Sequence, residues 1–454
     1  MADAAPHPLT FPNFRAYWLA RFLTTLAQTA MVIVIGWQVY DIARETMSIQ
    51  AAAFQLGLVG VAQFLPLLFL SLYAGWVADR IDRRWIARAA VGLEAACALS
   101  LGWLTWTGHI TLPALFTVAA LLGVARAFAG PALGALAPNL VPKAVLPTAI
   151  AFSSIAWQAA SVLGPAMGGY LYAAAGWLTY ATSGTMFLLA FLMLMLIGPI
   201  PRAIIRSTSG PWTQMIDGLR YVRRNRLVFG AISLDLFAVL LGGATAMLPI
   251  YARDILQVGA EGLGHLRAAP SLGAVVVALW FGVRPLRRNV GVKMLIAVAI
   301  FGAANALFGL SVPIFQPFFG SAAVGSDFAP AVLFALACLF VVGAADMVSV
   351  YVRQSLIQLH TPDEMRGRVG AVSTLFISGS NELGEARSGF LAALVGPAVA
   401  VTAGGIAAVG VTALWTRIFP QLRLARTFDP PDELLILEPD MPNPKPVHAK
   451  GPTS

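Results

Sequence analysis

Charged residues are scarce in this chain. Asp, Glu, Lys and Arg make up 11% of its 454 residues, whereas soluble globular proteins carry about 25%. Hydrophobic residues reach 58%, more than a soluble protein of this length can hide in its interior. These two values exclude a soluble globular protein and indicate that most of the chain lies in a lipid bilayer.

Cysteine and histidine are also few. Cys97 and Cys338 both lie in apolar runs, and the five histidines are scattered, so neither a disulfide framework nor a metal site is expected. We expect both cysteines to be packing residues. The phosphate-binding pattern GxxxxGK[ST] is absent, which excludes an ATP-driven cycle of that type. The sequence therefore predicts no metal or other cofactor, no use of ATP and no enzymatic activity.

The apolar residues form twelve runs of about 20 residues, the length that spans a bilayer as a helix. The runs are continuously apolar rather than alternating, which excludes the strands of a membrane barrel. We therefore predict an all-α membrane protein with twelve transmembrane helices in two six-helix bundles. The helices are placed at 16–40, 52–78, 85–107, 111–135, 145–173, 178–198, 228–252, 263–284, 292–312, 330–356, 368–395 and 398–418.

A polar, arginine-rich stretch separates the two sets of six runs. We predict an N-terminal bundle at 1–198, a cytoplasmic linker at 199–227, a C-terminal bundle at 228–418 and a cytoplasmic tail at 419–454. The tail is proline-rich and polar, so disorder is expected there. The linker segment WTQMIDGLRYVRRNR has apolar residues at helical spacing, which predicts a helix that lies either on the inner leaflet or in solvent.

The net charge of +9 is carried by short basic clusters between the apolar runs, so an inner membrane leaflet is a better partner than nucleic acid. With both termini in the cytoplasm, 23 of the 30 basic residues lie inside and four lie within helices. This asymmetry predicts a multi-pass protein with cytoplasmic termini. Three basic residues are then placed outside, namely Arg44, Arg253 and Arg267.

The most specific local motif is GWVADRIDRRW, between the second and third helices. Glycine permits close approach of helices, and an aspartate can face the positive end of another helix. The motif resembles the loop GxxxDRxGRR of the major facilitator superfamily, although Asp82 replaces the central glycine. The alternative is an ordinary basic loop. The resemblance implies that this loop forms a cytoplasmic gate. We add to it two arginines near the start of helix eleven, so the predicted gate consists of Gly75, Asp79, Arg80, Arg83, Arg84, Arg366 and Arg368.

Helices four and five carry two further patterns. Arg126 and Gly130 resemble an RxxxG motif of the superfamily, and an arginine in an apolar run needs a cavity or a carboxylate partner unless it reaches the interface. SVLGPAMGGYL resembles the GPxxGG motif of its antiporter branch. Ordinary helix packing is the alternative for this segment. We predict helix bending and close packing at Gly130, Gly164, Pro165, Gly168 and Gly169.

Acidic residues lie within helices of the second half. Glu382 and Glu385 are three residues apart and share one helix face, so their mutual repulsion favours a bound proton on one of them. Arg387 is expected to neutralise a carboxylate from another element. The alternative is that these groups form structural ion pairs. We predict that proton or substrate coupling involves Arg126, Asp235, Asp346, Glu382 and Glu385.

The segment Thr361–Pro397 and the start FPNFRAYWLARFLTTLA resemble the branch of the superfamily that includes enterobactin exporters and transmembrane secretion effectors. The resemblance covers residues 10–425. In that branch we expect NELGEFESG where this chain has NELGEARSG, so Arg387 stands in place of an acid. The resemblance implies a bacterial inner (plasma) membrane protein and a secondary transporter that works by alternating access.

We therefore predict proton-coupled export of a small amphipathic organic molecule, such as a siderophore-like metabolite or a drug, by a monomeric transporter. Residues expected to line its cavity are Gln28, Trp37, Gln38 and Gln158. Two alternatives remain. An uncoupled facilitator or importer would not depend on the acidic residues, and a non-transporting sensor or scaffold would use them only for structure.

Overall fold

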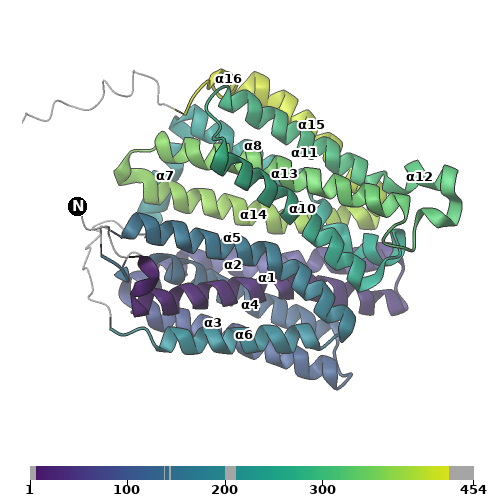
Figure 1. The fold of residues 1–454 in the computed structure, drawn as a ribbon, viewed down its shortest axis with the longest axis horizontal. Coiled ribbons are helices and arrows are strands. Elements are labelled where there is room, and N and C mark those ends of the chain that lie inside the picture. The colour runs from purple at the N-terminus through teal and green to yellow at the C-terminus, as the bar shows by residue number, and fades with distance from the viewer. Residues whose placement is uncertain (1–6, 137–138, 143–144, 200–210, 429–454) are drawn as a thin grey trace, which may run out of the picture.

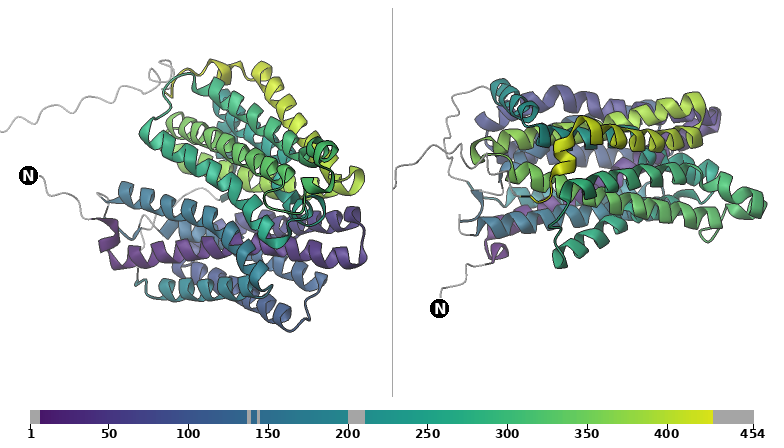
Figure 2. Two further views of the ribbon diagram at one scale, coloured as in Figure 1. Left: turned by 45° about the vertical axis from the view of Figure 1, so that its right-hand side comes forward. Right: turned by 90° about the horizontal axis from the view of Figure 1, so that it is seen from above.

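Long helices form two stacked groups in the computed structural model of the chain (Figure 1). The structure describes residues 7–136, 139–142, 145–199 and 211–428, without the side chains of some residues inside helices. Helices α1 to α6 form one group, and α8 to α16 form the other (Figures 1 and 2). Within these described ranges the chain contains no strand, so the all-α prediction is confirmed.

The first group follows the predicted helices closely. A short 3-10 helix, η1, at Pro8–Thr10 precedes it. Its six helices are α1 (Pro12–Thr46), α2 (Ile49–Arg80), α3 (Arg83–Trp106), α4 (Leu112–Leu136), α5 (Leu146–Ala174) and α6 (Leu178–Met195). We call the end of the molecule where α1 leads into α2 the outer end, and the end where α2 leads into α3 the inner end.

The linker helix α7 (Pro211–Arg224) precedes the second group. Its seventh membrane helix consists of α8 (Arg226–Gly242), η3 (Ala244–Met247), α9 (Leu248–Ile250) and the π-helical η4 (Tyr251–Ile255). The following elements are α10 (Gly259–Val283), α11 (Val290–Gly309), α12 (Ser311–Phe319), η5 (Gly320–Ala323), α13 (Pro330–Leu359), α14 (Asp363–Val395), α15 (Pro397–Ile418) and α16 (Pro420–Leu424).

Ten helical segments within the described residues are long and apolar enough to span a membrane. Helices α5 and α14 are not counted in these ten, but they lie between them and have comparable length. They bring the number to the twelve that the sequence predicts. Local chemistry sets several of the boundaries. Ser48, Asp82 and Asn225 each accept a hydrogen bond from a backbone N–H in the first turn of the helix that follows them, which is the role of an N-cap.

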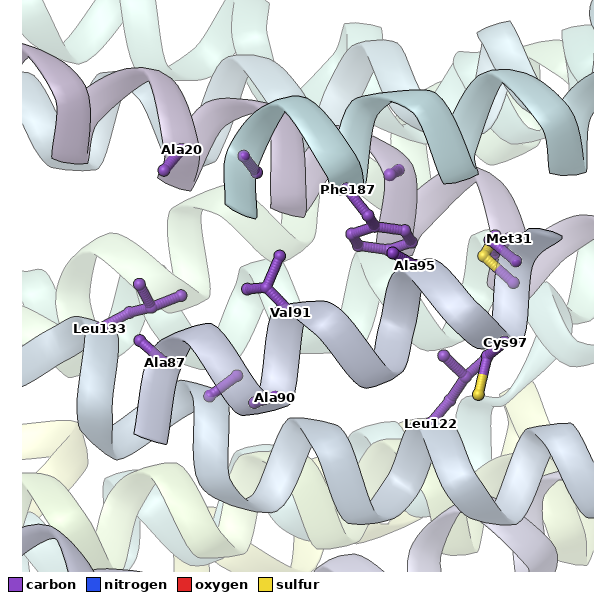
Figure 3. Close-up of a cluster of buried hydrophobic side chains, with 14 of the residues drawn as sticks. Ala20, Met31, Ala87, Ala90, Val91, Ala95, Cys97, Leu122, Leu133 and Phe187 are labelled. Carbon is purple, nitrogen blue, oxygen red and sulfur yellow. The ribbon is translucent and has the colours of Figure 1, made fainter. Parts of the chain in front are cut away.

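The first group has its own apolar core, formed largely by small residues that let the helices approach closely (Figure 3). Phe187 of α6, Met31 of α1, Val91 of α3 and Leu122 of α4 belong to this core. Cys97 lies in the same cluster and is buried as a free thiol. The expected packing role of this cysteine is thus what the structure shows.

The two groups meet along two helix pairs, α2 with α14 and α5 with α10. Glycines face each other at both contacts. A Cβ atom added to Gly169 would lie 2.6 Å from the Cα of Gly264, and one added to Gly57 would lie 3.2 Å from the Cα of Gly389. Because no side chain separates these backbones, the two halves touch directly at these points.

Three features of the second half differ from the predicted helices. The seventh helix is interrupted after Gly242, where Gly243 leaves helical geometry, instead of running unbroken over 228–252. The helix α12 at the outer end was not predicted. The tail begins with a packed turn rather than with disorder, since Leu422 of α16 is fully buried and Gly291 donates a backbone hydrogen bond to Ala425. Residues 429–454 lie outside the described part.

The linker helix α7 forms as predicted, but it packs on protein. Val222 is buried in a cluster with Val369 and Val372 of α14, and Tyr221 donates a hydrogen bond to the backbone carbonyl of His360 at 2.6 Å. These contacts fix α7 to the second half and leave Ile216 exposed. The alternatives of a free solvated helix and a helix lying only on the leaflet therefore do not describe α7.

Candidate functional site

Arg126 of α4 and Glu382 of α14 form an ion pair between the two halves. The Nη1 atom of Arg126 lies 2.8 Å from Oε1 of Glu382 and donates a second hydrogen bond of 3.2 Å to Oε1 of Gln63 in α2. Glu382 is nearly buried, whereas 31% of the Arg126 side chain is accessible. The sequence placed both residues within membrane helices, and the structure shows that they are partners.

Glu385 lies one turn after Glu382 on α14. A Cβ atom on Gly60 of α2 would lie 3.3 Å from the Glu385 Cβ, so this acid also faces the first half. It interacts electrostatically with Arg126 and with Arg267 of α10. The prediction placed Arg267 outside the membrane, and this is wrong, because Arg267 lies within the membrane-spanning helix α10. Its Nε atom is buried without a hydrogen-bond partner.

Glu94 of α3 is fully buried on the side of the first half. Gln28 of α1 donates a hydrogen bond to its Oε1 at 2.5 Å, and its Oε2 has no hydrogen-bond partner. Glu94 interacts electrostatically with Arg126. We define the central charge cluster as Glu94, Arg126, Arg267, Glu382 and Glu385.

Helix α4 leads from Arg126 toward the inner end. Gly130 and Gly134 follow at intervals of four residues, are exposed, and a Cβ atom on either would have no neighbour within 4 Å among the described atoms. Close packing therefore does not explain Gly130 in this conformation, contrary to the prediction. The open face of α4 continues the accessible side of Arg126 toward the inner end.

Asp235 and Arg353 form a second ion pair, which lies within the second half. Asp235 of α8 is 5% exposed and Arg353 of α13 is 3% exposed. Arg353 therefore pairs with an acid of another helix rather than with Asp346, which lies two turns before it. Asp346 also lies on α13 and has no charged partner among the described residues. The structure does not bring Asp235 or Asp346 into the central charge cluster.

The predicted inner gate is described only in part. Asp82 caps α3 and pairs with Arg84 at 2.6 Å, and Arg84 also donates a hydrogen bond to the Ile197 carbonyl. Because an N-cap has an extended backbone, aspartate suits this position as well as glycine does. Arg80 ends α2 and Arg83 begins α3. The side chains of three further predicted gate residues lie outside the described part, namely Gly75, Asp79 and Arg366.

Arg368 of α14 lies 3.4 Å from Asp217 of the linker helix α7. This contact connects the start of α14 with α7 at the inner end. Arg368 is predicted to contact the loop between α2 and α3 when the inner side is closed, and in the present conformation its ionic partner belongs to the linker. Gly218, the next residue of α7, lies against the backbone of Arg368, so α7 and α14 are in direct contact here.

The glycines of α5 divide between two neighbours. Cβ atoms on Gly164 and Gly168 would lie 2.7 Å from the Leu26 carbonyl oxygen and 2.9 Å from the Ala30 carbonyl oxygen of α1. Gly169 faces α10 of the other half, and Pro165 lies inside the helix between these contacts. Helix α5 thus contacts α1 of its own half on one face and α10 of the other half on another face.

Two of the residues expected to line a cavity are buried against other side chains instead. Gln38 accepts a hydrogen bond from the Tyr180 hydroxyl at 2.7 Å and donates one to Thr105, and it is 3% exposed. Trp37 is 6% exposed. The structure therefore assigns Gln38 to the packing of the first half and Trp37 to an apolar cluster shared with second-half residues such as Met247 and Tyr251, while the side chain of Gln158 lies outside the described part.

Sequence reasoning missed a set of charges at the outer end that we call the outer ion-pair cluster: Tyr40, Asp41, Arg44, Arg253 and Asp254. Asp254 of η4 accepts hydrogen bonds from the Tyr40 hydroxyl at 2.5 Å and from Arg44 Nη2 at 3.0 Å. Arg253 pairs in turn with Asp41 of α1. Each half thus contributes one acid and one base. The only signal in the sequence was their predicted position outside the membrane.

Among the described residues Arg387 pairs with no carboxylate, contrary to the prediction. Its Nη1 donates hydrogen bonds to the carbonyl oxygens of Leu240 at 2.9 Å and Leu241 at 2.5 Å. These carbonyls belong to the last turn of α8, next to the interruption of the seventh helix. The prediction failed because the interruption, which leaves carbonyls without helical N–H partners, was not recognised.

Twelve membrane helices in two groups, with a charge cluster between the groups, are the arrangement of a transporter of the major facilitator superfamily, to which a family model covering residues 4–427 assigns this chain. The chain belongs to the transmembrane secretion effector family, which matches residues 4–427. This family assignment agrees with the resemblance carried by the motifs of helices two, five and eleven.

Curated relatives match nearly the whole chain. The enterobactin exporter EntS of Escherichia coli O1:K1 / APEC is 27% identical over 431 residues, which cover 93% of this chain and 95% of the exporter. EntS of Escherichia fergusonii is 27% identical over 429 residues, with the same coverage. The similarity extends over both halves.

Solved structures share the fold at low sequence identity. A D-xylose-proton symporter has a TM-score of 0.67 at 14% identity and covers 91% of this chain and 98% of its own. A POT family transporter in complex with a thioalcohol conjugated peptide has a TM-score of 0.67 at 12% identity and covers 92% and 98%. At such identities the likeness establishes the fold alone.

Proposed function

We propose that this protein exports a small amphipathic organic molecule in exchange for protons, with the central charge cluster as the coupling site. The chain is a membrane transporter by family, and its relatives are exporters of enterobactin. A siderophore-like metabolite or a drug is the corresponding substrate class. The proposed transporter acts as a monomer in the bacterial inner membrane, with both termini in the cytoplasm.

The ion pair between Arg126 and Glu382 is the observation that carries this proposal. It joins the halves within the membrane, where a charged group is costly unless it has a partner or contacts water. Glu385 lies one turn away, and two acids so close together cannot both stay ionised without strong compensation. A proton bound to either acid would weaken the attraction to Arg126, and thereby the contact between the halves.

Alternating access gives the remaining predicted residues their proposed roles. The outer ion-pair cluster closes the outer end in this conformation, because it links α1 to η4 directly. Gly75, Asp79, Arg80, Arg83, Arg84, Arg366 and Arg368 would form the contacts that close the inner end in the opposite conformation. The glycine contacts of α5 and α2 would let the halves rock without side chains in the way.

The test is transport in sealed vesicles. Purified protein is reconstituted with a pH-sensitive dye inside, a proton gradient is imposed, and amphipathic metabolites are screened for substrate-dependent dissipation of the gradient. We expect Glu385→Gln to abolish this proton movement. Glu261→Gln is the matched control, because Glu261 lies exposed at the start of α10, away from the cluster.

Two outcomes would contradict the proposal. If a labelled compound crosses the membrane without moving protons, and Glu385→Gln transports it equally well, the protein is an uncoupled facilitator or importer. If no compound crosses while the reconstituted protein remains folded, the acids serve only structure, as in a sensor or scaffold.

A further inference from the structure

The interruption of the seventh helix lies between α14 and α15. Helix α8 ends at Gly242, and Gly243 has φ −34° and ψ 45°. A Cβ atom on Gly243 would lie 3.1 Å from the Gly384 carbonyl oxygen of α14, and one on Gly404 of α15 would lie 3.3 Å from the Arg387 Nη2. The interrupted backbone is therefore enclosed by protein rather than exposed to lipid, as backbone outside regular helices must be.

Arg387 supplies the hydrogen bonds that the interruption removes. The last carbonyls of a helix have no N–H partner within the helix, and Arg387 donates to those of Leu240 and Leu241. The guanidinium group is half-buried and has no carboxylate partner within the described residues. Its positive charge also lies at the negative end of α8, which is a favourable arrangement.

Near the interruption, helix α14 makes different contacts on two of its faces. Glu382, Glu385 and Ala386 face Gly60 of α2 in the first half. On another side, a Cβ atom on Gly384 would lie 3.1 Å from the Val239 carbonyl oxygen of α8, and Arg387 donates a hydrogen bond to the same turn of α8. The helix that carries the central acids is thus also the helix that holds the end of α8.

Beyond the interruption, the seventh helix leads to the outer ion-pair cluster. Residues 244–255 form η3, α9 and η4, and they end with Arg253 and Asp254. These two residues bond to Asp41 and Arg44 of α1. The helical hydrogen bonds are interrupted at Gly243. The position of this outer segment relative to α8 therefore depends on the backbone geometry of that residue.

We propose that Arg387 is a positioning residue that fixes the interruption of the seventh helix and thereby holds the outer segment in its closed position. It connects the helix of the central acids to the outer ion-pair cluster through hydrogen bonds to Leu240 and Leu241. This role rests on contacts within the second half and at the outer end, and it does not require that protons drive transport. The failure of the proposed proton coupling would leave it intact.

The test measures the distance between spin labels at the outer end of the full-length protein in lipid nanodiscs. Labels are attached to cysteines introduced at Thr46 of α1 and Glu261 of α10, both exposed, while Cys97 and Cys338 are buried. We expect Arg387→Gln to raise the ratio of long to short distances about tenfold, which corresponds to about 1.4 kcal/mol. Arg387→Lys should restore part of the short-distance population, because an ammonium group can still donate to one carbonyl.

Arg88 provides a matched control. It is a buried arginine that donates to helix-end carbonyls at Leu194 and Ile197, inside the first half and away from the seventh helix. Arg88→Gln should leave the outer distances as in the unmodified protein. The proposal is overturned if Arg387→Gln gives the unmodified distances, or if Arg88→Gln shifts them as much. If Arg387→Gln does not fold, Arg387→Lys decides: the role predicts an intermediate ratio of long to short distances, because one of the two hydrogen bonds is lost, and a ratio equal to that of the unmodified protein would exclude the role.

Discussion

At the scale of single residues, the two membrane-embedded ion pairs differ in what surrounds them. Arg126 and Glu382 belong to different halves, and the arginine is partly accessible. Asp235 and Arg353 belong to the same half and are both buried. A pair that joins moving parts can be broken during a transport cycle, whereas a pair inside one bundle is broken only by unfolding. We therefore assign the Asp235–Arg353 pair to stability.

This assignment predicts separate effects on stability and transport. Asp235→Asn leaves the charge of Arg353 buried without its partner, and breaking a buried pair costs about 3–5 kcal/mol. The variant should unfold at a clearly lower temperature in detergent. Asp235→Leu combined with Arg353→Met should recover most of the loss, because apolar replacement of both partners is often neutral. Transport per folded molecule should stay near normal in the double variant, and its loss there would assign the pair to the transport cycle.

At the scale of helices, small residues decide which helices touch. The pairs α2–α14 and α5–α10 approach through facing glycines, and backbone contact of this kind is possible only without a side chain. The interruption of the seventh helix and the packing of α7 on α14 are also properties of helix neighbours. None of these follows from the apolar runs alone.

The contact between α5 and α10 can be tested by size. Gly169→Val places a branched side chain where even a Cβ atom lies 2.6 Å from the Cα of Gly264. The halves would be forced apart, and we expect transport to fall at least about tenfold, the factor for 1.4 kcal/mol of lost contact. Gly134→Ala serves as the control, because its Cβ would meet no described atom within 4 Å. Comparable losses in both variants would show that the effect is not specific to this contact.

At the scale of the whole molecule, the halves are connected by charges at two levels. The central charge cluster lies within the membrane helices, and the outer ion-pair cluster links α1 to η4 at the outer end. In the outer cluster each half supplies one acid and one base, so a shift of either half breaks two ion pairs at once. An arrangement that forms and separates as a unit suits a gate.

The outer cluster can be tested by reversing charge. Arg253→Asp would face Asp41 with a like charge beside Asp254, so we expect the outer end to open and a cysteine introduced by Ala43→Cys, a position that is fully buried here, to become accessible to a thiol reagent. Adding Asp41→Arg restores an opposite-charge pair and should return accessibility toward that of the unmodified protein. The effect should weaken at high salt, because partly exposed pairs are screened. If the double variant remains as open as the single one, the ion pair does not hold this end closed.

The amino-acid sequence alone was enough for the class of the fold and for the positions of the membrane helices, apart from the interruption of the seventh helix and the extra helix α12. Continuous apolar runs of bilayer length leave the backbone no alternative to helices, because lipid offers it no hydrogen-bond partners. It also placed Arg126, Glu382 and Glu385 within the membrane, since the cost of a buried charge makes such residues stand out in an apolar run. The motifs were sufficient to indicate the superfamily and its branch.

Which charges are partners became clear only from the way the helices pack against one another. Arg126 and Glu382 are 256 positions apart, and neither periodicity nor spacing within one helix carries information about a contact between two halves. The same reason explains the errors. Arg267 was assigned to the outside by charge counting, Arg387 was assigned a carboxylate, and the outer ion-pair cluster was missed, because each depends on how separate helices are placed against one another.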